Sequence, residues 1–332
     1  MAVVTMQTFP ADHLQALAEA ACIASGASAA MARSLVAASL SADWVGRHEV
    51  GLAHMLDYLD ALREGRIDGE AKPVITRPAG AVISADARGG IAQLAFDLAF
   101  DDLQGLARNL GIAIFVLRGS YPAGELGYYV RRLAEAGLVA MAWTNAHAML
   151  AVEGCAQPVF STNPMAFAAT RGDKPALVID QASSATAYVN VARAASQGRS
   201  IPLGWAQDAQ RQPTTDPAQA ILGAMLPFGG YKGANIALMV EVMAGGLAGA
   251  NWSLDVGHFA SGDHLPGAGL SVVAMAPGLC APDFEARLNT QIERLQGLGL
   301  HIPGGGAPDA PFGPASRIPV EADIYARLVA AS

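Results

Sequence analysis

A glycine-rich run with a single lysine, Pro227-Phe-Gly-Gly-Tyr-Lys-Gly233, is the stretch of this chain best suited to holding an anion. Its spacing differs from that of a Walker A motif, but a predicted helix begins directly after it, at Ala234. Backbone N–H groups and the helix dipole at such a start favour a negatively charged ligand. A tight turn with a surface lysine accounts for the same residues equally well, so both interpretations are kept.

A polar run between two predicted helices, Arg47-His48-Glu49, is followed by His54, and these side chains could exchange protons with a substrate. A solvated helix start is the commoner reason for such residues. The runs Thr162-Asn163-Pro164 and Pro213-Thr-Thr-Asp-Pro217 have the composition of turns.

Several common motifs are missing from the sequence. None of the seven histidines belongs to a His-Glu-x-x-His pair or has metal-spaced Cys or Asp neighbours, so no metal site is expected. The sequence also contains no Gly-x-Ser-x-Gly elbow, and no Gly-x-Gly-x-x-Gly fingerprint follows a predicted strand. The three cysteines, Cys22, Cys155 and Cys280, are odd in number and widely spaced, which indicates reduced, mostly buried thiols and a cytoplasmic protein.

The secondary structure that positions these residues is predicted to be helical in the first part of the chain and mixed after it. Before Gly65, apolar residues at helical spacing predict helices after Asp12, from Ala29 to Leu40 with Ser28 as N-cap, and around residues 52–62. After Pro73, short β-rich runs alternate with helix-length segments, which predicts a mixed α/β (α+β) core. The predicted strands are 81–84, 112–116, 138–142, 176–179 and 270–274, and the predicted helices are 92–110, 233–250, 284–298 and 320–330. Residues 305–314 are expected to form an exposed, mobile loop.

Composition limits the class of protein. The 332 residues carry 21 Lys and Arg against 29 Asp and Glu, a net charge of −8, which disfavours binding to nucleic acid. Only 15% of the residues are charged, against about 25% in an average soluble domain, and this scarcity favours a buried subunit interface. No apolar run is long enough to span a bilayer, so no membrane partner is expected.

A set of runs spread in order over most of the chain is more specific than any of these motifs. The runs are Ala42–Tyr58, Gly65–Gly69, Gly124–Tyr129, Phe160–Phe167, Asp180–Ser184, Ile201–Ala206, Pro213–Pro217, and Leu226–Gly233 followed by Glu241. Together they resemble the type-2 malate/lactate dehydrogenase family, and within it the Δ1-piperideine-2-carboxylate/Δ1-pyrroline-2-carboxylate reductases. The family reduces 2-oxo acids or cyclic 2-imino acids with NADH or NADPH.

The resemblance implies a fold that is not a Rossmann domain. Residues 1–72 and 284–332 are expected to form one helical layer, and residues 73–283 a central sheet domain that binds nicotinamide and substrate. A homodimer and a small carboxylic or imino acid substrate are also implied. By position, Thr162 falls where relatives contact substrate, and the expected cofactor contacts are Ala123, Gly124, Glu125, Leu126, Gly127, Asp180, Gln181, Ala182, Tyr231, Lys232, Pro303, Gly304 and Gly305.

The chain departs from the family at functional positions. Relatives close to the imine reductases carry arginines where this chain has Gly305-Gly306-Ala307, so the choice between NADPH and NADH stays open. The family's catalytic Ser-His-Gly corresponds to Glu49-Val50-Gly51, and valine cannot donate a proton. The arginine expected to hold the substrate carboxylate is His54, and the aspartate that accompanies the catalytic histidine is Asn190.

Another group must therefore supply the proton, and the nearby candidates are His48, Glu49, His54 and Tyr121. The leading hypothesis is a nicotinamide-dependent reductase with a rearranged proton-donor set, acting on an imine because a protonated imine needs less acid assistance than a ketone. A repurposed enzyme that performs cyclisation, dehydration or isomerisation on a similar acid is the alternative, and a non-catalytic binding protein is the third.

Overall fold

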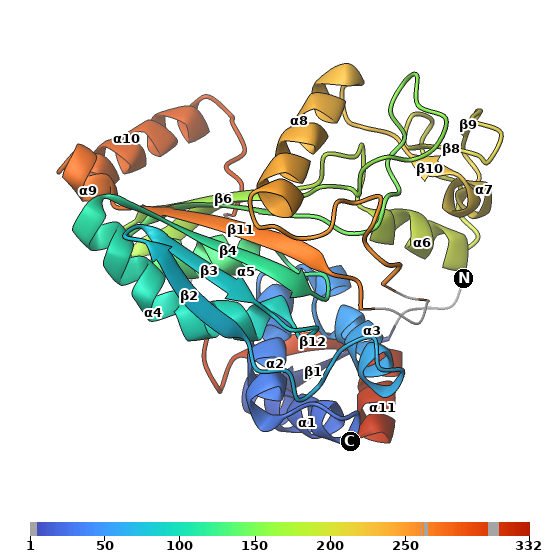
Figure 1. The fold of residues 1–332 in the computed structure, drawn as a ribbon, viewed down its shortest axis with the longest axis horizontal. Helices are drawn as coiled ribbons and strands as arrows, with labels where there is room; N and C mark the ends of the chain where they lie inside the picture. Colours follow the sequence, from blue (N-terminus) through green and yellow to red (C-terminus); the bar gives the residue numbers. More distant parts are fainter. Residues whose placement is uncertain (1–4, 260, 262–264, 305–311) are drawn as a thin grey trace.

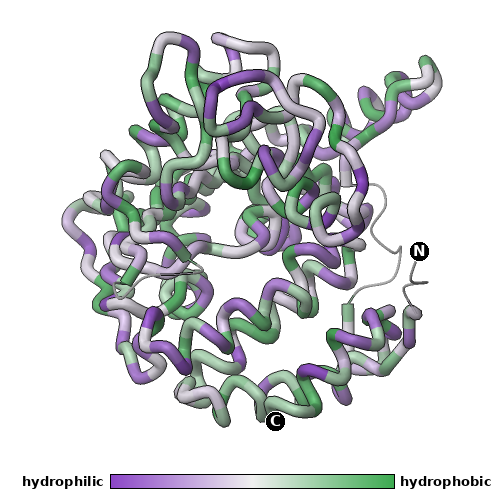
Figure 2. The backbone as a smooth tube through the Cα atoms, turned by 90° about the vertical axis from the view of Figure 1, so that its right-hand side faces the viewer, coloured by the Kyte–Doolittle hydropathy of each residue, from purple (hydrophilic) through white to green (hydrophobic). Residues whose placement is uncertain are grey.

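The computed structural model describes residues 5–259, 261, 265–304 and 312–332. A seven-stranded sheet carries helices on both faces, a helical part closes one end of it, and a small three-stranded sheet lies at the other side (Figure 1). Hydrophobic and hydrophilic residues alternate along the helices (Figure 2), as expected for helices with one packed and one solvated side. No helix among the described residues is long and apolar enough to cross a membrane.

The helical part combines both ends of the chain. Its elements are β1 (Met6–Pro10), α1 (Ala11–Ala24), α2 (Ala29–Trp44), the 3-10 helix η1 (His48–Val50), α3 (Leu52–Arg63), β12 (Arg317–Glu321) and α11 (Ala322–Ala331). The predicted N-cap of α2 is confirmed, because the backbone N–H of Met31 donates to Ser28 Oγ at 3.4 Å. β1 pairs with β12 in antiparallel register, which joins the two ends.

The prediction of a helix from Val320 was wrong at its start. Ile318 and Val320 belong to β12, where both point into the core with at most 4% of their surface exposed. This period of two is typical of a strand, but it spans too few residues to be distinguished from the start of a helix in the sequence.

The main sheet has the strand order β2-β3-β4-β11-β5-β6-β7. β3 and β4 are parallel, and all other neighbours are antiparallel. The predicted strands all fall within it, and their observed bounds, with those of the two unpredicted strands β2 and β6, are β2 (Val74–Ala79), β3 (Val82–Asp86), β4 (Ile112–Ser120), β5 (Val139–Thr144), β6 (Met165–Arg171), β7 (Lys174–Gln181) and β11 (Ala268–Met275). Because β3, β4, β5 and β7 run in one direction, their carboxyl ends meet at one edge of the sheet.

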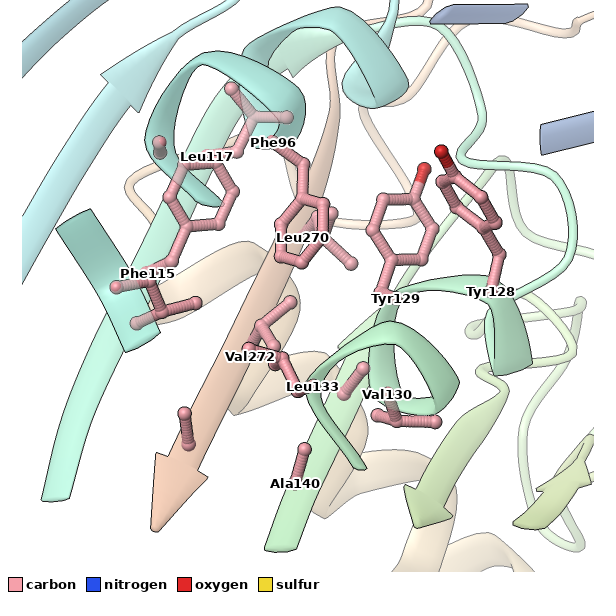
Figure 3. Packing of buried hydrophobic residues seen from close by; sticks show 14 of the residues in the cluster. Phe96, Phe115, Leu117, Tyr128, Tyr129, Val130, Leu133, Ala140, Leu270 and Val272 are labelled. Atoms are coloured by element: carbon pink, nitrogen blue, oxygen red, sulfur yellow. The ribbon is translucent and has the colours of Figure 1, made fainter. Parts of the chain in front are cut away.

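The two faces of the sheet carry different helices. α4 (Ala92–Leu110), as predicted, and α5 (Gly127–Glu135) cover one face, whose core contains the residues drawn in Figure 3. α8 (Tyr231–Glu241) and the π-helix η2 (Val242–Gly246) cover the other face. The helix predicted for 233–250 therefore begins earlier, and it changes to π geometry after Glu241.

The remaining elements flank the sheet. β8 (Ala206–Gln207), β9 (Pro213–Thr214) and β10 (Ala224–Met225) form the small sheet beside α6 (Tyr188–Ser196) and α7 (Pro217–Leu222). After α9 (Pro277–Cys280), the helix α10 (Phe284–Gly297) packs against β6. The C-terminal residues thus lie in two places, with α10 on the sheet and α11 on α1, and the division into domains at 72/73 and 283/284 stays a prediction.

Two expectations about exposure have different outcomes. Cys22 is buried, but Cys155 is partly exposed and Cys280 is exposed, so the prediction of mostly buried thiols was wrong for Cys280. The predicted loop 305–314 falls largely outside the described residues, as does Gly305.

Candidate active site

The candidate site lies at the sheet edge where β4, β5 and β7 end. The segments that leave or enter the sheet there bring together residues far apart in the chain. They include Tyr121 and Ala123–Gly127 after β4, His147 after β5, Thr162 before β6, Gln181 and Ala182 at the end of β7, and His258 and Phe259 before β11. Carboxyl ends of parallel strands are frequent places for ligands in α/β proteins.

The loop Ala123–Gly127 is fixed by hydrogen bonds to its backbone. Gln93 Nε2 donates to the carbonyl of Ala123 at 3.0 Å, and the hydroxyl of Tyr129 donates to the same oxygen at 2.8 Å. Gly124 has a φ of +72°, and a Cβ there would lie 3.3 Å from the Tyr58 hydroxyl. The loop therefore holds a rigid conformation that favours glycine at this position.

Asp180 joins this loop to β7. The backbone N–H of Gly127 donates to Asp180 Oδ2 at 2.7 Å, and Arg47 donates to the Asp180 carbonyl at 3.3 Å. Glu125 lies beside them in an ion pair of 2.7 Å with Arg131. Burial, followed by the charge of Glu125, raises the pKa of Asp180 to about 6.

Three of the four cofactor segments expected from the sequence line one cleft of about 1030 Å³, through Glu125, Asp180 and Gly304. α2 and α5 form its walls together with the β6–β7 hairpin. Gly304 is pressed against β7, since a Cβ there would lie 2.8 Å from the backbone nitrogen of Val178. This volume is at the upper end of the range for small-molecule sites.

The fourth cofactor segment, Tyr231-Lys232, forms the first turn of α8. Backbone hydrogen bonds place that turn next to the residues that follow β7: the N–H of Phe228 donates to Ser183 O at 3.0 Å, and the N–H of Ala185 donates to Leu226 O at 2.7 Å. Tyr231 is 70% exposed. The glycine-rich run is therefore both a tight turn and an open helix start.

Thr162 is positioned by a buried polar network. Its carbonyl accepts from the Ser183 N–H at 2.8 Å. The neighbouring Asn163 has a φ of +37°, and its side-chain amide donates to Glu241 Oε2 at 2.8 Å. Glu241 also accepts from the backbone N–H and the hydroxyl of Ser253, at 2.5 and 2.6 Å. One carboxylate thus fixes the turn that presents Thr162.

His48 forms a dyad with a carboxylate that the sequence did not single out as catalytic. Its Nδ1 lies 2.9 Å from Oδ1 of the buried Asp43, whose other oxygen accepts from the Leu52 N–H at 2.8 Å. A Cβ at Gly51 would lie 2.4 Å from the Asp43 carboxyl carbon, so this glycine makes room for the carboxylate. The hydrogen bond to Asp43 raises the pKa of His48.

His54 and Tyr121 belong to a second cluster, around Phe259. His54 Nδ1 lies 2.8 Å from Asp57, and its ring meets the edges of Tyr58 and Phe259. The Tyr121 hydroxyl donates to the Phe259 carbonyl at 3.1 Å, and burial raises its pKa to about 12. Tyr121 is thus buried, and its hydroxyl is occupied by a backbone hydrogen bond.

No motif or spacing in the sequence indicates two further members of the Phe259 cluster. The rings of His147 and His258 lie 4.1 Å apart, and both contact Phe259. Burial lowers the pKa of His147 to about 4, so its ring is neutral at pH 7. Isolated histidines in loops, near no motif, could not be assigned to a site from spacing.

The other two expected catalytic positions lie outside these dyads. Glu49 lies in η1, and its Oε1 is 4.0 Å from Nη1 of Arg47, the residue that precedes η1. Asn190 is exposed on α6 and donates to Thr186 Oγ1 at 2.9 Å. Within the described ranges, Asn190 makes no hydrogen bond to a residue of η1, and no group of three His, Cys, Asp or Glu side chains could hold a metal ion.

The raised pKa of Asp180 makes a testable contribution to stability. Its carboxyl binds a proton more tightly in the folded state, with a pKa of about 6 against 3.8 for the free group, so its ionisation destabilises the fold as pH rises from about 4 to 6. We expect Asp180→Asn to raise the free energy of unfolding at pH 8 by on the order of 2 kcal/mol and to have no such effect at pH 4. Urea denaturation at both pH values measures this, and Asp173→Asn, an exposed aspartate of the same cleft, should show no difference.

Comparisons with known proteins show which family the chain is similar to. Residues 9–304 match the model of the malate/L-lactate dehydrogenase family. The chain is 37% identical over 307 residues to a Δ1-pyrroline-2-carboxylate/Δ1-piperideine-2-carboxylate reductase of Pseudomonas putida, covering 90% of this chain and 89% of that protein. It is 36% identical over 269 residues, 80% of either protein, to a (2R)-3-sulfolactate dehydrogenase (NADP+) of Chromohalobacter salexigens.

A solved structure is similar along the whole fold. The crystal structure of a Δ1-piperideine-2-carboxylate reductase from Pseudomonas syringae superposes with a TM-score of 0.90 at 31% identity, covering 98% of this chain and 100% of that one. The fold expected from the sequence is thereby confirmed.

Proposed function

Because the chain belongs to the malate/L-lactate dehydrogenase family of oxidoreductases, we propose that it is a nicotinamide-dependent reductase of a cyclic 2-imino acid. The observation that carries this proposal is the cleft in which Glu125, Asp180 and Gly304, expected from the sequence to meet the cofactor, line the same space. The names of the relatives support a cyclic imino acid rather than a simple 2-oxo acid.

The residues present fit a dinucleotide. Gly304 lines the cleft, and Gly124 and Gly127 lie in the same loop as the lining residue Glu125. A Cβ at each of these glycines would meet a neighbouring group within 3.3 Å. Five cationic side chains line the cleft among five acidic ones. When bound, the nicotinamide supplies the hydride to the imine carbon.

His48 is the proposed proton donor in place of the residue at Val50. The buried Asp43 fixes the ring through Nδ1, and its hydrogen bond raises the pKa of His48, which favours the imidazolium form that a general acid needs. Nε2 of His48 gives its proton to the imine nitrogen, and solvent returns a proton to His48, whose side chain is 35% exposed. Thr162 and His54 hold the substrate carboxylate, and Gln181, Ala182, Leu126, Ala123 and Pro303 complete the cofactor contacts.

The test is turnover by the purified protein. We expect oxidation of NADPH or NADH, followed at 340 nm, with Δ1-piperideine-2-carboxylate or Δ1-pyrroline-2-carboxylate, and much slower oxidation with pyruvate or oxaloacetate. Protein that binds neither cofactor and oxidises neither in the presence of these substrates would rule the reductase out.

A non-redox enzyme is the second candidate, favoured by one observation: Val50 and Asn190 offer no acid at the family's catalytic positions. It predicts that the chain binds the cyclic acid and converts it without consuming a nicotinamide. Product analysis by mass spectrometry distinguishes the two, since reduction adds two hydrogens whereas cyclisation and isomerisation add none, and dehydration removes water.

We propose further that two copies associate through the face of α8. Large apolar side chains on α8, η2 and the segment after them are exposed, at 51% for Leu238, 50% for Val242 and 53% for Leu247. A contiguous apolar face of this kind is typical of a protein interface.

Val242→Asp is expected to convert a dimer into monomers, because a charge in the centre of an apolar interface cannot be solvated. Light scattering after gel filtration measures the mass. Leu98→Asp on α4, a residue that is 58% exposed on another face, is the control and should leave the mass unchanged. A monomeric wild type would refute the association.

A further inference from the structure

The cleft extends beyond the catalytic edge of the sheet, along β7. This strand has eight residues, Lys174–Gln181, and so spans about 23 Å. Asp180 marks one end of the cleft, next to Gly127, and the β6–β7 hairpin marks the other. An extended dinucleotide with its nicotinamide at the Asp180 end would place its adenosine half near the hairpin.

One cation at the hairpin end differs from the other four of the cleft. Arg131, Arg132, Lys174 and Arg47 each have a carboxylate within 4.0 Å. Arg171 makes no ion pair within the described part of the chain.

The guanidinium of Arg171 is held by neutral groups instead. Its Nε donates to Asn289 Oδ1 at 2.9 Å and its Nη1 to the Pro175 carbonyl at 3.5 Å, while the Asn289 amide returns a hydrogen bond to the Arg171 carbonyl at 3.2 Å. Asn289 belongs to α10, the helix that packs on the hairpin. The result is a preoriented guanidinium with no ion pair of its own among the described residues, which suits bidentate binding of a phosphate group. Its charge acts only at longer range on Glu293, whose pKa is lowered chiefly by its partner Lys174 and in smaller part by Arg171.

Two aromatic rings line the same cleft from the helical part. Trp44, in the last turn of α2, and Phe312 lie with ring centroids 5.8 Å apart at 46°. Phe312 is 42% exposed. Every nucleobase has a π-face, and exposed aromatic rings beside a phosphate site are suited to stacking on one.

We propose that the hairpin end of the cleft is an adenosine subsite, in which Trp44 and Phe312 stack on the adenine and Arg171 binds the 2′-phosphate of NADPH. This inference rests on the proposed function, because it assigns one half of the cofactor. Relatives close to the imine reductases carry arginines where this chain has Gly305-Gly306-Ala307, and in this chain Arg171 of the β6–β7 hairpin takes their place as the cation that selects NADPH.

The test compares adenosine fragments, which lack the nicotinamide, with the whole cofactors. Titration calorimetry of the wild-type protein should show 2′,5′-ADP binding at least tenfold more tightly than 5′-AMP. Arg171→Gln should weaken 2′,5′-ADP and NADPH by about 10- to 100-fold while changing the Kd of NADH by less than twofold. Arg171→Lys, which keeps the charge but not the bidentate geometry, should fall between the two. Trp44→Ala should weaken all these ligands, with or without the 2′-phosphate.

Arg108→Gln is the matched control, since Arg108 lies on α4 outside the cleft and donates to the Ala136 carbonyl. It should change none of these constants. If wild-type protein binds the cofactors but Arg171→Gln leaves NADPH binding unchanged, or weakens NADH equally, the subsite is wrong and the reductase proposal stands. If wild-type protein binds neither cofactor nor 2′,5′-ADP, the proposed function fails and the subsite with it.

Discussion

Asp43→Asn should lower kcat for the reduction of a cyclic imine by about 10²- to 10⁴-fold, the usual contribution of a general acid. Asp43 holds the His48 ring through Nδ1 at 2.9 Å and raises its pKa. Asparagine removes the negative charge, so less imidazolium is present at neutral pH and the ring loses its fixed orientation.

The pH dependence of kcat tests whether Asp43 acts through the protonation of His48. His48 must be protonated to act as an acid, so the rate should fall as pH rises through its pKa. The Asp43 carboxylate raises that pKa, and Asp43→Asn should therefore move the alkaline limb of kcat to lower pH. A purely structural role for Asp43 would reduce the rate without moving the limb.

Asp57→Asn is the matched control, because Asp57 contacts Nδ1 of the other candidate, His54, at 2.8 Å. If His48 is the donor, this variant keeps the wild-type pH profile. The opposite outcome, in which only Asp57→Asn moves the limb, would transfer the role to His54. Since Asp43 is buried and also accepts from Leu52, His48→Asn provides a variant of a more exposed residue with the same expected loss of rate.

The sequence predicts elements whose signal is local and misses those that depend on distant partners. The runs of β4, β7 and β11 each contain at least two β-branched residues, and α4 has a long amphipathic pattern, so the sequence predicts their positions. β6 is Met-Ala-Phe-Ala-Ala-Thr-Arg, and its alanines favour a helix in isolation. β6 is a strand because it pairs with β5 and β7, and this tertiary effect cannot be detected in the local sequence.

The end of α8 shows the same limit. The helical pattern of the sequence continues to Ala250, but the structure changes to π geometry at Val242–Gly246. Gly246 lies against Trp252, whose ring would come within 2.8 Å of a Cβ at that position. This contact forms only after the chain turns back, and the periodicity of the sequence contains no information about it.

The candidate site divides in a similar way. The resemblance predicts which segments meet the cofactor, and Glu125, Asp180 and Gly304 do line one cleft. The partners of His48 and Arg171 were not predictable, because Asp43 reaches His48 only when η1 folds back against α2, and Asn289 lies 118 positions from Arg171 in the sequence. A usable signal for Asp43 existed, because it is the one acidic residue of α2 and belongs to the run Ala42–Tyr58.

Glu241→Ala should destabilise the protein by on the order of 3–5 kcal/mol, the largest effect we expect on stability. Glu241 accepts from the Asn163 amide and from the N–H and hydroxyl of Ser253. Alanine leaves these buried donors without their acceptor, and each such group costs about 1–3 kcal/mol. Because the Asn163 turn presents Thr162, KM for the imino acid should also rise in whatever fraction remains folded.

Urea denaturation measures the stability change, and Glu241→Gln separates its causes. Glutamine keeps the shape and one oxygen acceptor, so it should recover part of the stability and part of the substrate affinity. Glu19→Ala, at a partly exposed glutamate on α1 whose carboxylate accepts from Gln15, is the control for loss of a carboxylate and should change stability by less than about 0.5 kcal/mol. Equal effects at Glu19 and Glu241 would mean that the network does not hold the turn, and Thr162 would then need another support.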